Sequence, residues 1–265
     1  TIIVVTSDNG MPFPRGKGQV FPYDNRLPLA IRWGKGIKNP GRIIDDYVSF
    51  SDFAPTFLEL AGVDSANQNM EDFSGMSWKN IFNDNPILKK RDYMIIGKER
   101  HDVGRPNDKG YPVRAIIAEG YFYSLNFKSE RWPAGNPETG YLNTDGSPTK
   151  TEILNLKREG LNADYWDLSF GKRPEETLYD LRKDPDCIEN IVQNDKYSFI
   201  KDSLRKVLIE DLTINKDPRI LGYGDLFDNY TYAEKRTRNF YERYMRGELL
   251  DADWVNSKDF EKPLD

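Results

Sequence analysis

A carboxylate, an amide and a lysine follow the first apolar run of the chain. Asp8 and Asn9 come directly after "TIIVVTS", and Lys17 lies eight residues beyond Asn9, among glycines and prolines. Carboxylate and amide oxygens are hard ligands that suit Ca²⁺ or Mg²⁺. The lysine ammonium is a compact positive charge that suits a tetrahedral oxyanion. Together, a divalent cation and a lysine can neutralise the charge on a transferring sulfuryl or phosphoryl group.

These residues also have a simpler interpretation. Asp8-Asn9-Gly10 is a common turn tripeptide, and a turn alone would explain it. Arg15 lies two residues before Lys17 and is a second cation that competes for the same role. The spacing by itself leaves both questions open.

The elements around this loop indicate an α/β fold. The β-branched run "TIIVV" is typical of a strand buried on both faces of a parallel sheet, and "LPLAIRW" (residues 27–33) predicts a second strand. In open α/β sheets, ligands bind beyond the carboxyl ends of the strands, which is where Asp8 and Asn9 lie. A helix is expected to begin after Asp52 as its N-cap and to end at Gly62.

The pattern of predicted elements changes after about residue 71. "GYPVRAIIAEGYFYSLNF" (residues 110–127) predicts a hairpin that turns at Glu119-Gly120, and "ETLYDLRKDPDCIENI" a strand followed by a helix. We therefore expect the end of a mixed sheet flanked by helices in residues 1–90. Residues 91–265 should form a smaller antiparallel sheet with a packing helix and a helical tail. Because a lone leading strand needs neighbours, we also expect that an upstream portion of the protein is missing from this sequence.

Composition excludes several classes of protein. The formal net charge of −5 disfavours nucleic-acid binding by bulk charge, and no apolar run is long enough for a transmembrane helix. The single cysteine, Cys187, allows no internal disulfide and no cysteine metal site.

Three motifs in order resemble those of type I sulfatases, in the alkaline phosphatase superfamily. "TSDNG" with its lysine loop and "NRLPLAIRWGKG" is similar to the second signature region of that family. "VSFSDFAPTFLELAGV" resembles the helix that follows, and "ETLYDLRKDPDCIENI" the late family motif. The segments "DNGMPFPRGK", "ERHDVGRPNDKGYPVRAI" and "NFKSERWPAGNPE" resemble the heparan N-sulfatase (sulfamidase) branch.

The resemblance implies a calcium-dependent hydrolase of sulfate esters or sulfamates on glycosaminoglycan-type sugars, with N-sulfoglucosamine favoured. It implies that Asp8 and Asn9 supply half of a calcium site and that Lys17 contacts the sulfate. The family's nucleophile is a formylglycine made from the cysteine of C-x-P-S-R. Since Cys187 lies in "DPDCIEN", this chain lacks that nucleophile, and we expect the chain alone to be inactive. The family also implies a secreted, periplasmic or lysosome-like location.

Other cations and rings are candidates for substrate contacts. Arg15 is one candidate. The single histidine, His101, is another and would lie at the rim of a pocket that binds a sulfated sugar; the alternative is that His101 lies in a solvated loop without a binding role. Arg114 either binds substrate or forms a structural ion pair. Arg131 and Trp132 are candidates for contact with a second sugar.

Two other functions stay open. One is a phosphodiesterase or phosphonate hydrolase of the same superfamily, although a single histidine argues against a two-zinc enzyme. The other is a sugar-binding module without catalysis.

Overall fold

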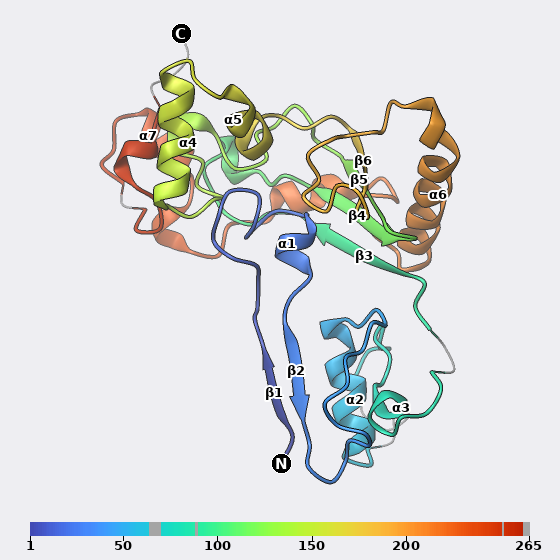
Figure 1. Ribbon diagram of the computed structural model, residues 1–265. Coiled ribbons are helices and arrows are strands. Elements are labelled where there is room, and N and C mark those ends of the chain that lie inside the picture. Colours follow the sequence, from blue (N-terminus) through green and yellow to red (C-terminus); the bar gives the residue numbers. More distant parts are fainter. Residues whose placement is uncertain (64–69, 88–89, 251, 262–265) are drawn as a thin grey trace. The chain divides into compact units, whose positions relative to one another are not determined.

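The computed structural model describes residues 1–63, 70–87, 90–250 and 252–261 (Figure 1). Its strands are β1 (Ile3–Thr6), β2 (Leu29–Arg32), β3 (Tyr93–Lys98), β4 (Val113–Ala118), β5 (Tyr121–Asn126) and β6 (Glu176–Asp180). Its helices are α1 (Pro22–Asn25), α2 (Phe53–Leu60), α3 (Lys79–Phe82), α4 (Pro148–Arg158), α5 (Ala163–Phe170), α6 (Ser198–Ile214) and α7 (Phe240–Met245). Within these residues, no helix has the length and apolarity that a membrane crossing needs.

The chain separates into two compact units. The first comprises Thr1–Ser7 and Pro28–Met94, and the second comprises Asp8–Leu27 and Ile95–Asp265. The loop between β1 and β2, which carries the candidate metal ligands and Lys17, thus belongs to the second unit. The assignment of residues 1–90 and 91–265 to two domains stays a prediction.

In the first unit, β1 and β2 pair antiparallel, with Val4 opposite Ile31. The side chains of Ile3 and Val5 are 52% and 64% exposed. The strand predicted in the first apolar run is confirmed as β1, but parallel pairing and burial on both faces are not found in the described residues, where β1 pairs antiparallel with β2.

Helix α2 begins at Phe53, directly after Asp52 as expected, but the Asp52 side chain does not cap it. A short 3₁₀ turn (Phe50–Asp52) precedes it, and Ser49 rather than Asp52 caps this entry. Asp52 is fully buried and accepts hydrogen bonds from the backbone of Met76 and from the indole of Trp78. The guanidinium of Arg91 pairs with the same carboxylate, and the pKa of Asp52 is lowered although burial opposes the shift. Asp52 therefore ties three segments of the first unit together instead of capping the helix.

The second unit is built on a sheet with the order β3-β4-β5-β6. The predicted hairpin is confirmed, since β4 pairs antiparallel with β5 and the turn residues Glu119 and Gly120 both have positive φ, as the tightest hairpin turns require. β6 pairs antiparallel with β5. Helix α6 packs on β4 and β5, as expected for the packing helix, and buries Leu204, Leu208 and Leu212 along one face (Figure 1).

The core beside this sheet includes residues from the β1–β2 loop. Val20 and Phe21 pack with Val113, Phe122 and other buried residues of the sheet, the others being Tyr111, Ala115, Tyr179 and Cys187. Burying the aromatic and aliphatic side chains of the loop anchors it to the sheet. The site residues that the loop carries are thereby attached to the second unit.

Candidate functional site

The loop that carries Lys17 is closed by helix α1. The Asp24 carboxylate accepts hydrogen bonds from the backbone of Gly10 at 2.9 Å and of Gly18 at 3.0 Å. Burial raises the pKa of Asp24, and these backbone bonds oppose the rise. Lys98 Nζ donates to the Gly18 carbonyl at 2.6 Å. The segment from Gly10 to Gly18 is therefore held at both ends.

Lys17 forms an ion pair that sequence reasoning missed. Its Nζ lies 2.8 Å from Asp145 Oδ2, and the two side chains are 30% and 23% exposed. Asp145 belongs to the loop that precedes α4, 128 residues further along the chain. "TDGSP" predicts a turn before a helix, and nothing in it marks Asp145 as a partner for Lys17.

His101 lies beside the same loop. Gly18 has a φ of +77°, and a Cβ added there would come 2.4 Å from His101 Cδ2, so glycine is needed for the close approach. Burial, together with the nearby charges of Lys98 and Lys17, lowers the pKa of His101 to about 4. The imidazole is thus neutral near pH 7, and the structure brings it close to the loop of Lys17. Its predicted contact with substrate stays a prediction.

The three candidate arginines all have protein partners. Arg15 donates to the carbonyls of Leu168, Asp186 and Cys187 at 2.7–2.9 Å, and its guanidinium lies 4.3 Å from the centre of the Phe21 ring. These contacts give Arg15 a structural role, and its proposed contact with substrate would have to compete with them.

Arg114 and Arg131 are held by carboxylates. Arg114 pairs with Glu99 and Asp217, each at 2.7 Å, and its side chain is 7% exposed. This is the structural ion pair that the sequence left open. Arg131 forms a bidentate ion pair with Asp228, with N–O distances of 2.9 and 2.7 Å. Such planar pairs are the strong form of an arginine–carboxylate contact.

Trp132 is half-buried in a cluster of rings and lysines. Its ring lies 6.0 Å from that of Trp166, edge to face, and Lys172 Nζ lies 5.1 Å from its centre. Among the described residues, no hydrogen bond, ion pair or ring contact joins Trp132 to Lys17 or His101, so its role in binding a second sugar stays a prediction.

Asp8 and Asn9 lie at the start of the loop. Asp8 is exposed, and in the described residues its carboxylate has no hydrogen bond or ion pair to the protein. A carboxylate and an amide oxygen fit Ca²⁺ chemically, but they are two of the 6–8 oxygens that the ion takes. In the described residues no group of three or more His, Cys, Asp or Glu side chains could hold a metal. Any calcium site here would need further ligands from elsewhere.

Known proteins that match this chain in sequence include sulfatases. An ulvan-active sulfatase of Formosa agariphila is 28% identical over 234 residues, which are 86% of this chain and 35% of that protein. The N-sulphoglucosamine sulphohydrolase of Homo sapiens is 24% identical, over 82% of this chain and 42% of that protein. The chain therefore spans well under half the length of these relatives. No protein-family model matches it.

Solved structures share the fold. A protein in complex with its substrate D-glucosamine-2-N,6-O-disulfate is 21% identical, with a TM-score of 0.52, over 82% of this chain and 35% of that chain. The phosphonate monoester hydrolase of Agrobacterium radiobacter is 17% identical, also with a TM-score of 0.52, over 79% of this chain and 34% of that chain. At such identities the likeness concerns the fold alone.

Proposed function

The chain is a homologue of sulfatases and has the fold of the C-terminal portion of these alkaline-phosphatase-like proteins, and we propose that it is part of a hydrolase that removes sulfate from sulfated sugars. The observation that carries the proposal is the loop from Asp8 to Gly18. It presents two hard oxygen ligands at its start and a partly exposed lysine within the part that is held at both ends.

Lys17 is the residue that we assign to the sulfate. Its ammonium would bind a non-bridging sulfate oxygen and stabilise the negative charge that grows there in the transition state. Asp145 keeps the side chain in place without substrate, and the anion would then take over from this carboxylate as its partner. The neutral His101 can accept or donate a hydrogen bond to the sugar without adding charge.

Asp8 and Asn9 are the residues that we assign to calcium. When bound, the ion would supply a further positive charge for the sulfate oxygens. The other ligands and the formylglycine nucleophile would come from a portion of the enzyme outside these 265 residues. The length of the relatives supports this proposal. A secreted, periplasmic or lysosome-like location stays a prediction.

The favoured substrate class is sulfated glucosamine, with the N-sulfate first. It is supported by the motif resemblance, by the human relative's name and by the disulfated glucosamine bound in one protein of the same fold. Ulvan is a second candidate, because the ulvan-active relative has the higher identity. Hydrolysis of a phosphonate monoester is a third, since a hydrolase of that class shares the fold.

The test is to change Lys17 in the complete enzyme. Lys17→Ala should lower kcat about 100- to 1000-fold, the scale of losing one donor to a developing oxyanion. Lys17→Arg should recover part of the rate, because it keeps the charge in another geometry. Lys206→Ala, at an exposed lysine of α6, is the matched control and should leave kcat unchanged.

The rates are measured on N-sulfoglucosamine, ulvan, a nitrophenyl sulfate and a nitrophenyl phosphonate. Turnover of the phosphonate alone would replace the sulfatase proposal by the phosphonate one. A normal rate for Lys17→Ala would remove Lys17 from the mechanism.

A further inference from the structure

Gly18 lies between two residues of the proposed site. It follows Lys17 directly in the chain, and its Cα lies against the imidazole of His101. A Cβ added at Gly18 would come 2.4 Å from Cδ2 and 2.8 Å from Nε2 of that ring. The φ of Gly18 is +77°, which a residue with a side chain rarely adopts. The backbone of Gly18 therefore fixes where the side chain of Lys17 starts relative to His101.

Two charged side chains hold the backbone of Gly18. Its N–H donates to Asp24 Oδ2 at 3.0 Å, and the other oxygen of this carboxylate accepts from the N–H of Gly10 at 2.9 Å. The carbonyl of Gly18 accepts from Lys98 Nζ at 2.6 Å. Since a peptide group is planar, fixing this N–H also orients the carbonyl of Lys17. Two consecutive peptide planes after Lys17 are thus fixed, and we call Asp24 and Lys98 the Gly18 clamp.

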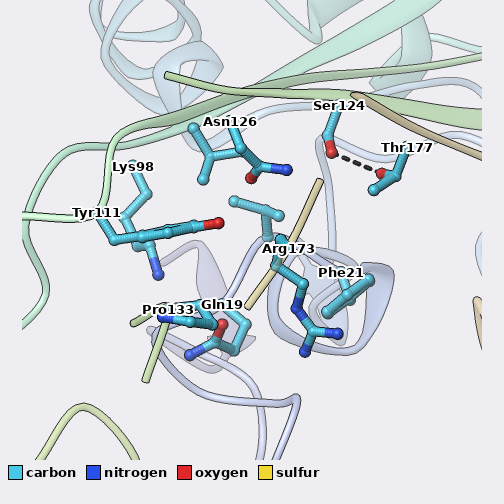
Figure 2. A pocket seen from close by; sticks show the side chains of 11 residues that line it. Gln19, Phe21, Lys98, Tyr111, Ser124, Asn126, Pro133, Arg173 and Thr177 are labelled. Carbon is cyan, nitrogen blue, oxygen red and sulfur yellow. Dashed lines mark hydrogen bonds between the residues drawn. The ribbon is translucent and has the colours of Figure 1, made fainter. Parts of the chain in front are cut away.

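Lys98 belongs to the same segment as His101. It is the last residue of β3, and His101 follows three residues later. The side chain of Lys98 lines a small pocket together with Gln19, the residue after Gly18 (Figure 2). The bond from Lys98 to Gly18 therefore joins this segment to the loop of Lys17.

The two residues of the clamp also support each other. Burial and the charge of Arg105 lower the pKa of Lys98 to about 7, and the Asp24 carboxylate opposes this shift. Burial raises the pKa of Asp24, and its backbone hydrogen bonds and the charge of Lys98 oppose that rise. Each residue favours the charged form of the other, so removing one should weaken the other's hold on Gly18.

We propose that the Gly18 clamp positions Lys17 against His101, so that the ammonium and the imidazole meet the same sulfated sugar. Val20 and Phe21 already attach the loop to the core, but apolar packing has no direction. Hydrogen bonds to the peptide groups of Gly18 do set an orientation. The effect on turnover rests on the proposed function, whereas the arrangement of Gly18 and His101 can be measured without substrate.

NMR measures the arrangement in the 265-residue chain at pH 6, where His101 is the single histidine. The parent chain should show a nuclear Overhauser effect between His101 Hδ2 and the Hα protons of Gly18. Lys98→Met removes one donor, and Asp24→Asn keeps the size of the side chain but removes one of two acceptors. Each variant should lose this effect and speed the exchange of the Gly18 amide proton.

The outcomes of this measurement are distinct. Lys206→Met, at an exposed lysine of α6, is the matched control and should keep the effect. If Lys98→Met fails to fold, Asp24→Asn still tests the clamp. An effect that is absent from the parent chain, or unchanged in both clamp variants, would overturn the proposal.

Kinetics of the complete enzyme then separate positioning from stability. Both clamp variants should lower kcat about 10- to 100-fold, the scale of a misplacement by about 1 Å, and change KM little. The reason is that a displaced Lys17 misses the oxygen on which negative charge grows in the transition state. Leu212→Ala removes a buried side chain of α6 and controls for lost stability, so the kcat of its folded fraction should be unchanged.

A normal kcat in both clamp variants would overturn the positioning role. If the parent enzyme hydrolyses no sulfated substrate, the proposed function fails, and the NMR comparison alone decides whether the clamp positions Gly18 against His101.

Discussion

At the scale of single residues, the candidate site depends on which charges are already paired. Arg15, Arg114 and Arg131 are held by carbonyls or carboxylates. In the described part of the chain, Lys17 has a single carboxylate partner, Asp145, and it remains partly exposed. A cation with a partner that can be exchanged is better placed to bind an incoming anion than one in a closed network. This difference is why we assign the sulfate to Lys17 and not to Arg15.

Asp145 should tune the affinity of Lys17 for anions. In the complete enzyme, Asp145→Asn removes the charge that competes with substrate and keeps the size of the side chain. Because a partly exposed ion pair contributes up to about 1 kcal/mol, inorganic sulfate should inhibit the variant up to about fivefold more strongly. Asp164→Asn, at an exposed position on α5, is the control. Weaker inhibition by sulfate would show that Asp145 does not compete for Lys17.

His101 should make the stability of the chain depend on pH. Its pKa is lowered from 6.5 to about 4, so between these values the unfolded state binds more protons than the folded state. The free energy of unfolding should therefore rise as the pH increases from 4 to 6.5. Below pH 4 the loss of stability due to His101 should have reached its full size. Urea unfolding of the parent chain and of His101→Gln at several pH values measures this dependence. The difference in free energy of unfolding between the two chains should change between pH 4 and 6.5; a constant difference would contradict the lowered pKa.

At the scale of elements, one buried lysine holds the loop that precedes α4. Lys150 is fully buried, and its Nζ donates to the carbonyls of Gly140 and Thr144 at 2.7 Å and of Tyr141 at 3.3 Å. The buried carboxylate of Asp259 lies 3.5 Å away. The lysine thus replaces regular secondary structure as the partner of these carbonyls. Asp145, next to Thr144, is positioned by this arrangement.

Replacing Lys150 should destabilise the chain strongly. Lys150→Met leaves three carbonyls without their donor and Asp259 without its cation, and breaking a buried pair in this way costs about 3–5 kcal/mol. The free energy of unfolding in urea measures the loss, and Lys206→Met should change it by less than about 0.5 kcal/mol. A loss below about 1 kcal/mol for Lys150→Met would mean that water replaces the ammonium.

At the scale of the whole molecule, the chain consists of two compact units and spans about a third to two fifths of the length of its relatives. Cys187 is buried in the core of the second unit, and burial raises the pKa of its thiol to about 12. A thiol of that kind is not a nucleophile near neutral pH. Cys187 is therefore no substitute for the formylglycine that the proposed reaction would use.

The 265-residue chain alone should have no sulfatase activity. The purified chain is assayed with calcium on N-sulfoglucosamine and on a nitrophenyl sulfate, beside the complete enzyme. Its rate should equal that of buffer, whereas the complete enzyme turns over. Clear turnover by the chain alone would refute our division of the catalytic groups.

Local patterns in the sequence determined several features of this protein. The hairpin turn at Glu119-Gly120 follows from backbone preferences and is confirmed, and so is the expected helix that packs on the antiparallel sheet. The pairing of "TSDNG" with a lysine loop also identified the segment that holds the candidate site. Such features need only neighbouring residues, because a turn or a helical face is set within a few positions.

The tertiary structure decided which charges are paired. Lys17 meets Asp145 across 128 residues, Arg114 meets Asp217 across 103, and neither partner is marked by its own surroundings in the sequence. The same holds for the direction of β1 against β2 and for the pocket beside Lys98. These features depend on the path of the chain, which packing of the whole core selects, so the types and spacing of residues could name the candidate groups but not their partners.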